Sequence, residues 1–191
     1  MFPEELSTDR LNLQKLSFQT ISPFELYEHV NEDAEDINEI TEYLSWEPHV
    51  NIKETEDFIK HTIKLWNKRE TITYVIFIND EFAGLTSLDI SWPKKRGELG
   101  IWLRKPFWGK GFSQERASAI LDLAFNKLDL KIVSVSHFKE NKKSEKAIKK
   151  YINNYNGQCD GILRNWVPTN NDVKDVCIYT ISKEQYIESI Y

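Results

Sequence analysis

The chain has 191 residues, which fits one domain of ordinary size, and 40% of them are hydrophobic, enough for a sizeable core. Its net charge is −5, and this acidic balance argues against nucleic acid as the main partner, since phosphate binding needs a basic face. The N-terminus carries acids and no apolar run, and no stretch approaches about 18 consecutive apolar residues. We therefore expect a single cytoplasmic domain over residues 1–191, with no signal peptide and no membrane partner.

Cysteine and histidine usage gives no sign of a metal site. The two cysteines, Cys159 and Cys177, fit no zinc-ligand spacing and form no C-x-x-C pair. The four histidines are scattered, without an H-E-x-x-H motif or a pairing four residues apart. We expect no metal, and two unpaired thiols in a reducing compartment.

The first half of the chain predicts a short strand, three helical segments and then three strands. The strand is DRLNLQKL, and the helical segments are SPFELYEHV, with its start at Ser22 and Pro23, DINEITEYLSWEPH and KETEDFIKHTIKLWNK. The three following runs are ITYVIFIN, FAGLTSLDISW and ELGIWL, and they are typical of an antiparallel meander.

The second half alternates helices with strands. Apolar residues recur at helical spacing from Ser113 to Leu128. The strand KIVSVSHF, the basic helix KKSEKAIKKYI and two strands follow, GILRNWV and DVCIYTIS, which the turn PTNND joins. This order predicts one α+β domain with a mixed sheet.

Two glycines, Gly109 and Gly111, lie between the strand ELGIWL and the helix that starts near Ser113. A helix N-terminus offers backbone N–H groups and the positive end of its dipole, which suit a phosphate. Glycine permits positive φ and close approach of a ligand to the backbone. The segment matches neither a Walker loop nor the dinucleotide fingerprint, because no third glycine follows Gly111 at the required spacing.

The segment LGIWLRKPFWGKGFSQERASAILDLAF resembles motif A of the GCN5-related N-acetyltransferases, in which a strand, a glycine loop and a helix hold the pyrophosphate of acetyl-CoA. TDRLNLQKL, NKKSEKAIKK and DGILRNW with KDVCIYTIS resemble the opening strand, the N-x-x-S motif and the closing hairpin of the ribosomal-protein-alanine (RimJ/RimL-type) branch. The resemblance covers about Ser7 to Ser182. It implies a mixed, mostly antiparallel central sheet flanked by helices, with splayed central strands, and acetyl-CoA as co-substrate.

The resemblance also implies which residues bind the cofactor: Ile101, Trp102, Leu103, Trp108, Gly109, Lys110, Gly111, Phe112, Ser113 and Asn141. Ser113 is expected to cap the following helix as well. Lys110 and Arg116 are near enough to the loop to aid phosphate binding, and each could equally be a solvated surface charge. The chain departs from the family pattern at Pro106, where the loop usually has Gln or Arg, and at Ile148, where many members have a tyrosine; Tyr151 does not match that position.

Two residues are candidates for the chemistry. Glu98 matches a glutamate of this branch and could accept a proton from the acceptor; the alternative is a strand-end glutamate paired with Arg96 or Lys95. Ser144, the serine of the N-x-x-S motif, could protonate the departing thiolate or bond the cofactor; the alternative is a helix N-cap. Asn141 could likewise be a loop residue that caps the same helix.

These features predict an N-acetyltransferase that works by direct attack of an amine on acetyl-CoA in a ternary complex. A protein N-terminal α-amine or a small-molecule amine, such as a polyamine or an antibiotic, could be the acceptor. The resemblance implies an acceptor site lined by the first two helices, the strand ends and the last hairpin, which points to Tyr43, Trp46, Glu47, His49, Trp92 and Trp166. The alternative for the stretch EYLSWEPHV is a helix end packed on the core. Ile148 in place of the tyrosine supports a further alternative, a non-catalytic CoA-binding module. The sequence makes no prediction of oligomeric state.

Overall fold

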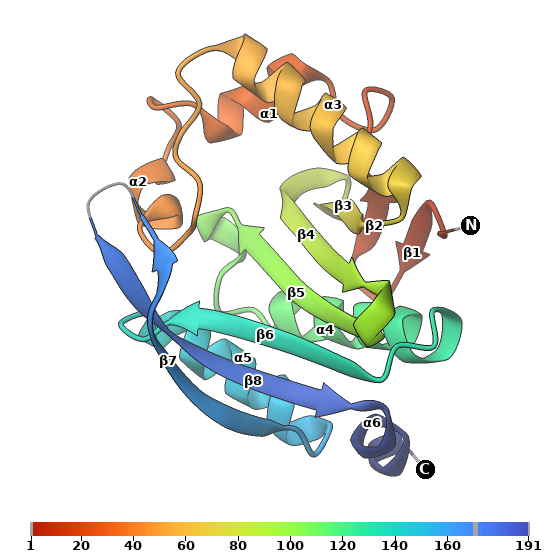
Figure 1. Cartoon of the computed structure of the whole chain (residues 1–191). Coiled ribbons are helices and arrows are strands. Elements are labelled where there is room, and N and C mark those ends of the chain that lie inside the picture. The colour runs from red at the N-terminus through yellow and green to blue at the C-terminus, as the bar shows by residue number, and fades with distance from the viewer. Residues whose placement is uncertain (1, 170–171, 191) are drawn as a thin grey trace. The chain divides into compact units, whose positions relative to one another are not determined.

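The computed structural model describes residues 2–169 and 172–190 (Figure 1). The strands are β1 (Glu5–Ser7), β2 (Asn12–Lys15), β3 (Thr71–Ile78), β4 (Glu81–Ser91), β5 (Arg96–Leu103), β6 (Ile132–Phe138), β7 (Gln158–Pro168) and β8 (Val173–Ser182). The helices are α1 (Pro23–Val30), α2 (Ile37–Thr41), α3 (Ile52–Lys68), α4 (Phe112–Asp122), α5 (Lys142–Asn154) and α6 (Lys183–Ile190). Two short 3-10 helices, η1 (Trp92–Lys94) and η2 (Lys105–Phe107), and a π-helix, η3 (Leu123–Lys127), complete the set.

The strands form an eight-stranded sheet in the order β1-β2-β3-β4-β5-β6-β8-β7. The β5–β6 pair is parallel, whereas the β1–β2, β2–β3, β6–β8 and β7–β8 pairs are antiparallel. This arrangement confirms the predicted α+β class with a mixed, mostly antiparallel sheet. Among the helices described, none combines the length and the apolar character that crossing a membrane requires.

The chain divides into two compact units, and strands β4 and β5 each run from one unit into the other. Unit 1 comprises Met1–Leu88 and Ile101–Lys110. Unit 2 comprises Asp89–Gly100 and Gly111–Tyr191. Because the division falls inside two strands, neither unit is a single continuous stretch of sequence.

In unit 1, helix α3 packs against α1 and β3 (Figure 1). β3 pairs with β2, and Leu13 of β2 lies opposite Ile76 of β3. β3 is buried along nearly all of its length, in line with its β-branched and aromatic sequence. One cluster of the unit's core consists of Leu16, Ile21, Leu26, Val30, Ile59, Val75, Phe82 and Leu85.

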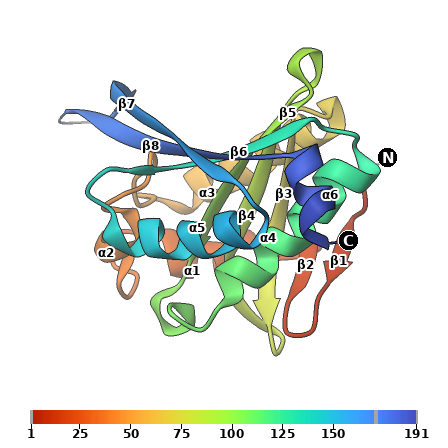
Figure 2. The same ribbon diagram turned by 90° about the horizontal axis from the view of Figure 1, so that it is seen from below.

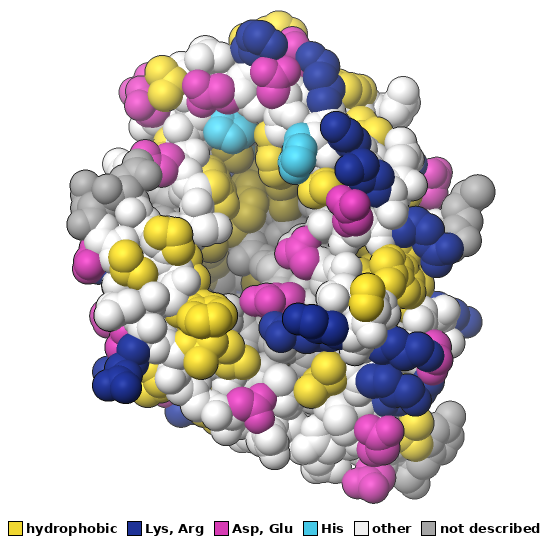
Figure 3. All heavy atoms as spheres, viewed as in Figure 1, with side chains coloured by type: hydrophobic (Ala, Val, Ile, Leu, Met, Phe, Trp, Pro, Cys, Tyr) yellow, Lys and Arg dark blue, Asp and Glu magenta, His cyan; other side chains and the backbone are white. Residues whose placement is uncertain are grey.

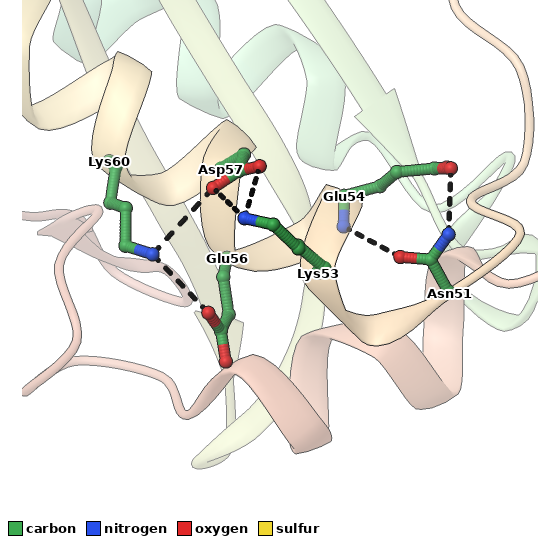
Figure 4. Close-up of polar contacts among 6 residues, drawn as sticks. All are labelled: Asn51, Lys53, Glu54, Glu56, Asp57 and Lys60. Carbon is green, nitrogen blue, oxygen red and sulfur yellow. Dashed lines mark hydrogen bonds and ion pairs between the residues drawn. The ribbon is translucent and has the colours of Figure 1, made fainter.

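Helix α3 begins with a side-chain cap and carries ion pairs on its exposed face (Figure 4). Asn51 Oδ1 accepts a hydrogen bond from the Glu54 backbone N–H at 3.3 Å, and Asn51 Nδ2 donates to Glu54 Oε1 at 3.0 Å. Lys53 pairs with Asp57 one turn later at 3.0 Å, and Lys60 lies 3.6 Å from the same aspartate. The cap satisfies a backbone donor that the helix itself leaves unpaired, whereas exposed pairs contribute little.

In unit 2, β6 lies between β5 and β8, and α5 runs along β6 and β8 (Figures 1 and 2). β7 pairs with β8 through two register shifts. α6 returns to contact β8, and the ring of Tyr186 lies tilted at 5.0 Å from Phe125 and 5.3 Å from Tyr155. Asp129 joins two parts of this unit, through ion pairs with Lys95 at 2.8 Å and Lys183 at 2.7 Å.

Most of the predicted elements are present, and three differences stand out. The second helical segment is shorter than predicted: only Ile37–Thr41 is helical, and the chain then turns so that Trp46 reaches the core. β1 and α6 were not predicted. The predicted turn PTNND includes residues 170–171, which lie outside the described residues.

Candidate active site

The glycine loop has the backbone conformation that only glycine adopts readily. Gly109 has φ 74° and Gly111 has φ 87°, both left-handed, and Gly111 is the N-cap of α4. No side chain of the described residues caps α4. A Cβ added at Gly109 would meet none of the described atoms within 4 Å, so the space above this residue is open. A loop with these properties is suited to an anion at the start of α4.

Two hydrogen bonds hold the approach to the loop within unit 1. The Trp108 indole N–H donates to the Leu103 carbonyl at 2.7 Å, and Arg10 Nη1 donates to the Lys110 carbonyl at 3.1 Å. Nothing in the local sequence singled out Arg10, because it lies 100 residues before its partner. Trp108 thus folds back on the end of β5 and fixes the path of the chain.

The expectation for the start of α4 needs one correction. Ser113 is not the N-cap, because α4 begins at Phe112 and Gly111 occupies the cap position. The Ser113 side chain is half-buried. Phe112 is buried, with 8% of its surface exposed, so its side chain is part of the core.

Arg116 is not a solvated surface charge. Its side chain is fully buried in α4, and none of its three guanidinium nitrogens has a hydrogen-bond partner among the described residues. Burial lowers the pKa of Arg116, while the neighbouring Tyr151 opposes this shift. A guanidinium enclosed in this way is not available at the surface to aid phosphate binding.

Glu98 belongs to a polar cluster on β5 and β6. The parallel register places Glu98 opposite Ser134. Arg96 Nη2 donates to Glu98 Oε2 at 3.2 Å and to Ser134 Oγ at 3.1 Å, and Ser136 Oγ donates to Glu98 Oε1 at 3.4 Å. The alternative of an Arg96 pairing is therefore observed, whereas Lys95 pairs with Asp129 instead. The Glu98 side chain is still 46% exposed, so its carboxylate is held in place and remains accessible.

The N-x-x-S motif forms the start of α5. Asn141 Oδ1 accepts a hydrogen bond from the Ser144 backbone N–H at 2.9 Å, so the N-cap is Asn141 and not Ser144. The capping alternative is confirmed for Asn141 and wrong for Ser144. The cap uses the side-chain oxygen Oδ1 of Asn141 and not the N–H groups of its side-chain amide.

No tyrosine of α5 takes the place that Ile148 leaves. Ile148 is 6% exposed and Tyr151 is 1% exposed, so both side chains belong to the core of unit 2. Burial raises the pKa of Tyr151 to about 12. A phenol that is both buried and reluctant to ionise is poorly suited to give a proton to a departing thiolate.

The acceptor candidates fall in both units. Tyr43, Trp46, Glu47 and His49 follow α2 in unit 1, whereas Trp92 lies in η1 and Trp166 in β7, both in unit 2. Trp166 is 62% exposed. The side chains on the face viewed in Figure 3 carry both signs of charge, mixed with hydrophobic groups.

Trp46 and His49 form part of a larger set of aromatic contacts in unit 1. The ring centroids of Trp46 lie 5.7 Å from Trp102 and 6.2 Å from His49. Trp102 continues the set to Phe82 at 5.8 Å, and Phe82 stacks on His29 at 5.0 Å. The sequence did not point to Phe82 or His29, because these contacts join α1, β4 and β5 across long distances in the chain.

Comparison with known proteins extends these observations. The chain is 25% identical over 186 residues to an "Uncharacterized N-acetyltransferase p20" of Bacillus licheniformis, and the match covers 96% of this chain and 98% of that protein. A solved structure of RimL, a ribosomal L7/L12 α-N-protein acetyltransferase in complex with coenzyme A, is similar with a TM-score of 0.82 and 20% identity, over 94% of this chain and 98% of that one.

A second solved structure is the microcin C7 self immunity acetyltransferase MccE in complex with acetyl-CoA and AMP, with a TM-score of 0.78 and 22% identity, over 92% of this chain and 96% of that one. At these identities the two structures show the shared fold. The family model described as an acetyltransferase (GNAT) domain matches residues 10–151. The chain therefore belongs to the GNAT acetyltransferase family and is an N-acetyltransferase with acetyl-CoA as its co-substrate.

Proposed function

We propose that this enzyme transfers the acetyl group directly to an amine in a ternary complex, and that a protein N-terminal α-amine is the first candidate for the acceptor. The observation that carries the proposal is the passage from β5 to α4 through Gly109 and Gly111, both left-handed, with open space above Gly109. The similar solved structures are compatible with a protein acceptor and with a small-molecule acceptor. One is a ribosomal-protein acetyltransferase, and the other is a microcin immunity acetyltransferase.

In this proposal acetyl-CoA is held by the loop, the end of β5 and the start of α5. The backbone of Trp108–Ser113 binds the pyrophosphate at the N-terminus of α4, and the exposed Lys110 adds a cation. Backbone groups of Ile101–Leu103 hold the acetyl end, and Asn141 contacts the pantetheine arm with the amide N–H groups that its cap leaves unused. The central strands are proposed to splay there and admit the cofactor.

The reaction needs a neutral amine, a stabilised oxyanion and a thiolate that leaves. The amine nitrogen attacks the acetyl carbonyl carbon, the C–S bond breaks, and the nitrogen gives up a proton. In this proposal Glu98 accepts that proton as the general base, and hydrogen bonds from Arg96 and Ser136 orient its carboxylate. A strand N–H of Ile101–Leu103 stabilises the oxyanion, and Ser144 protonates the thiolate or bonds the cofactor.

An N-terminal α-amine suits this site because it has a pKa near 7.7–8.0, so that an appreciable fraction is already neutral at pH 7. A lysine amine has a pKa near 10.4 and is almost wholly protonated at pH 7, so it depends more strongly on a general base. We further propose that the two units act as a single domain over residues 1–191. The family match spans parts of both units, and β4 and β5 pass from one to the other.

The first test is calorimetric titration of the protein with acetyl-CoA, beside the double variant Gly109→Asp, Gly111→Asp. We expect the wild type to bind and the variant not to bind, because two carboxylates would replace the space and the charge that a phosphate requires. Gly161→Asp is the matched control: Gly161 also has a positive φ, 133°, and a Cβ there meets no described atom within 4 Å. Absence of binding by the wild type would overturn the proposal.

The roles of the catalytic candidates are tested separately. Glu98→Gln should lower kcat by about 10²-fold or more while acetyl-CoA binding is kept, since a general base contributes typically 10²–10⁴-fold. Product mass spectrometry on a panel of peptides and small amines identifies the acceptor. An unchanged rate and pH profile in both Glu98→Gln and Ser144→Ala would show that these two residues do not act chemically.

A further inference from the structure

We infer that the acceptor carries an aromatic or flat apolar group beside its amine, and that this group binds to an aromatic surface of unit 1. We define the aromatic surface as Trp46, Trp102, Phe82, His29 and His49. The inference rests on the proposed function, since it assigns the acceptor side of the same transfer reaction.

The rings of this surface form a continuous series. His29 stacks on Phe82 at 5.0 Å and nearly parallel, with 16° between the ring planes. Phe82 meets Trp102 edge-on at 5.8 Å, Trp102 meets Trp46 at 5.7 Å, and Trp46 meets His49 at 6.2 Å. These spacings are those of favourable aromatic pairs, so the rings support one another in fixed orientations.

The rings of the aromatic surface pack against the core of unit 1, and four of the five are partly exposed. Phe82 is a buried member of the core of unit 1, and Trp46 and Trp102 pack against that core while only partly buried. His29 and His49 are also partly exposed. A rigid indole pair that keeps part of its area in water gains by covering that area with another apolar or aromatic group.

The position of Trp102 connects this surface to the acetyl group. Trp102 lies in β5 between Ile101 and Leu103, the residues proposed to hold the acetyl end of the cofactor. An acceptor whose side group covers Trp102 and Trp46 is therefore placed beside the strand where attack takes place. All five rings and this part of β5 belong to unit 1.

The charged groups near the rings are of both signs. Burial lowers the pKa of both His29 and His49 below the usual 6.5, so both imidazoles are mainly neutral near pH 7. Arg104 also lowers the pKa of His29 while Glu28, Glu25 and Glu81 raise it, and Arg104 pairs with Glu81 at 2.8 Å. The class of acceptor therefore follows from the rings themselves, which gain more from another flat ring than from the aliphatic chain of a polyamine.

The experiment compares matched acceptors. Initial rates of CoA release are measured with phenethylamine, butylamine and spermidine, and with short peptides that differ only in a first residue of Phe, Leu or Ser. We expect the aryl acceptors to show a kcat/KM about three- to tenfold above the aliphatic ones, the range that an aromatic pair supplies. Equal values, or a preference for spermidine, would overturn the inference.

Variants locate the effect on the surface. Trp46→Ala should abolish the preference for aryl acceptors, and Trp46→Phe should retain most of it because a ring remains. Phe24→Ala is the control, since Phe24 is an aromatic residue of unit 1 that is 73% exposed and outside the surface. A preference that survives in Trp46→Ala would place the aryl group elsewhere and overturn the inference.

Calorimetry with acetyl-CoA on each variant separates this inference from the proposed function. If the wild type and the variants bind acetyl-CoA and acetylate amines without an aryl preference, only the inference fails. If the wild type neither binds acetyl-CoA nor acetylates any amine, the proposed function fails and the inference fails with it.

Discussion

Arg116 places a guanidinium in the interior of unit 2 without a hydrogen-bond partner among the described residues. A buried charge carries a large desolvation cost, and the neighbouring Tyr151 offsets only part of it for Arg116. We therefore expect Arg116→Met, which keeps the apolar stem and removes the charge, to raise the free energy of unfolding by about 1–3 kcal/mol in urea denaturation. Arg164→Met, at an exposed site of β7, should change it by less than about 0.5 kcal/mol.

A loss of stability in Arg116→Met would mean that the guanidinium is well paired in solution, and the prediction would be wrong. Arg116→Ala is less informative because it also leaves a cavity, which destabilises by itself.

His29 and His49 predict how the stability of unit 1 depends on pH. Burial lowers the pKa of both imidazoles below the usual 6.5, so the unfolded chain takes up protons before the folded one does. Stability is then fully present above about pH 6.5 and falls as the pH drops through that value towards the folded pKa. The urea midpoint should be lower at pH 5.5 than at pH 7.5.

The double variant His29→Gln, His49→Gln should lose part of this difference between the two pH values. His61→Gln is the control, because His61 is exposed on α3. The same drop between pH 7.5 and pH 5.5 in wild type and double variant would assign the acid sensitivity to other groups.

A residue's environment could be predicted from the sequence when its neighbours lie close along the chain, and could not when they lie far away. The left-handed glycines at Gly109 and Gly111 were predictable, because a strand followed by Gly-x-Gly and a helix defines its own backbone. The burial of Arg116 was not, since an arginine near the start of a helix is usually solvated. Its environment depends on α5, which lies about 30 residues away and whose packing the local pattern does not describe.

Among the elements, α3 offers the clearest stability test. Asn51→Ala removes the side-chain acceptor for the Glu54 backbone N–H (Figure 4). We expect the free energy of unfolding to fall by about 0.5–2 kcal/mol, the usual range for loss of an N-cap. Lys53→Ala, which removes only an exposed ion pair with Asp57, should lower the free energy of unfolding by less than Asn51→Ala does.

Denaturant unfolding followed by far-UV circular dichroism measures both variants. Equal costs for Asn51→Ala and Lys53→Ala would show that the cap contributes no more than the surface charges.

Elements with strong periodicity were predictable, and those whose shape depends on tertiary contacts were not. The long stripe of α3 and the apolar run of β3 indicate their own structure. The segment after Ile37–Thr41 carries helical spacing, yet Trp46 leaves the helix to pack against the core of unit 1. β1 has only three residues, too few to give a recognisable alternation, and it exists because it pairs with β2.

At the scale of the whole molecule, the class of fold followed from the order of elements, and the family resemblance supplied the topology. The order of strands and helices predicts an α+β domain, but it does not state that β8 lies between β6 and β7. That inversion follows from β8 pairing with β6 over seven residues, Ile132–Phe138, a long-range choice that the local sequence does not encode. The same holds for the candidate site. Each of its motifs can be recognised in the sequence, but the local sequence does not show how the motifs are brought together.

Binding of acetyl-CoA at the loop Trp108–Ser113 should raise the stability of the folded chain. A ligand that binds only the native state stabilises it by about 2.7 kcal/mol at a concentration of 100 times its Kd. For a chain of this length, that corresponds to a rise in Tm of roughly 5–10 °C.

Differential scanning calorimetry with and without acetyl-CoA measures the shift, and hydrogen exchange shows where amides are protected. We expect protection of the loop Trp108–Ser113 and of the first turn of α4, because the proposed pyrophosphate site lies there. The Gly109→Asp, Gly111→Asp double variant should show no rise in Tm, while Gly161→Asp should show the full rise. A rise of equal size in the double variant would place the bound acetyl-CoA away from the loop, and the assignment of the pyrophosphate to the start of α4 would have to be abandoned.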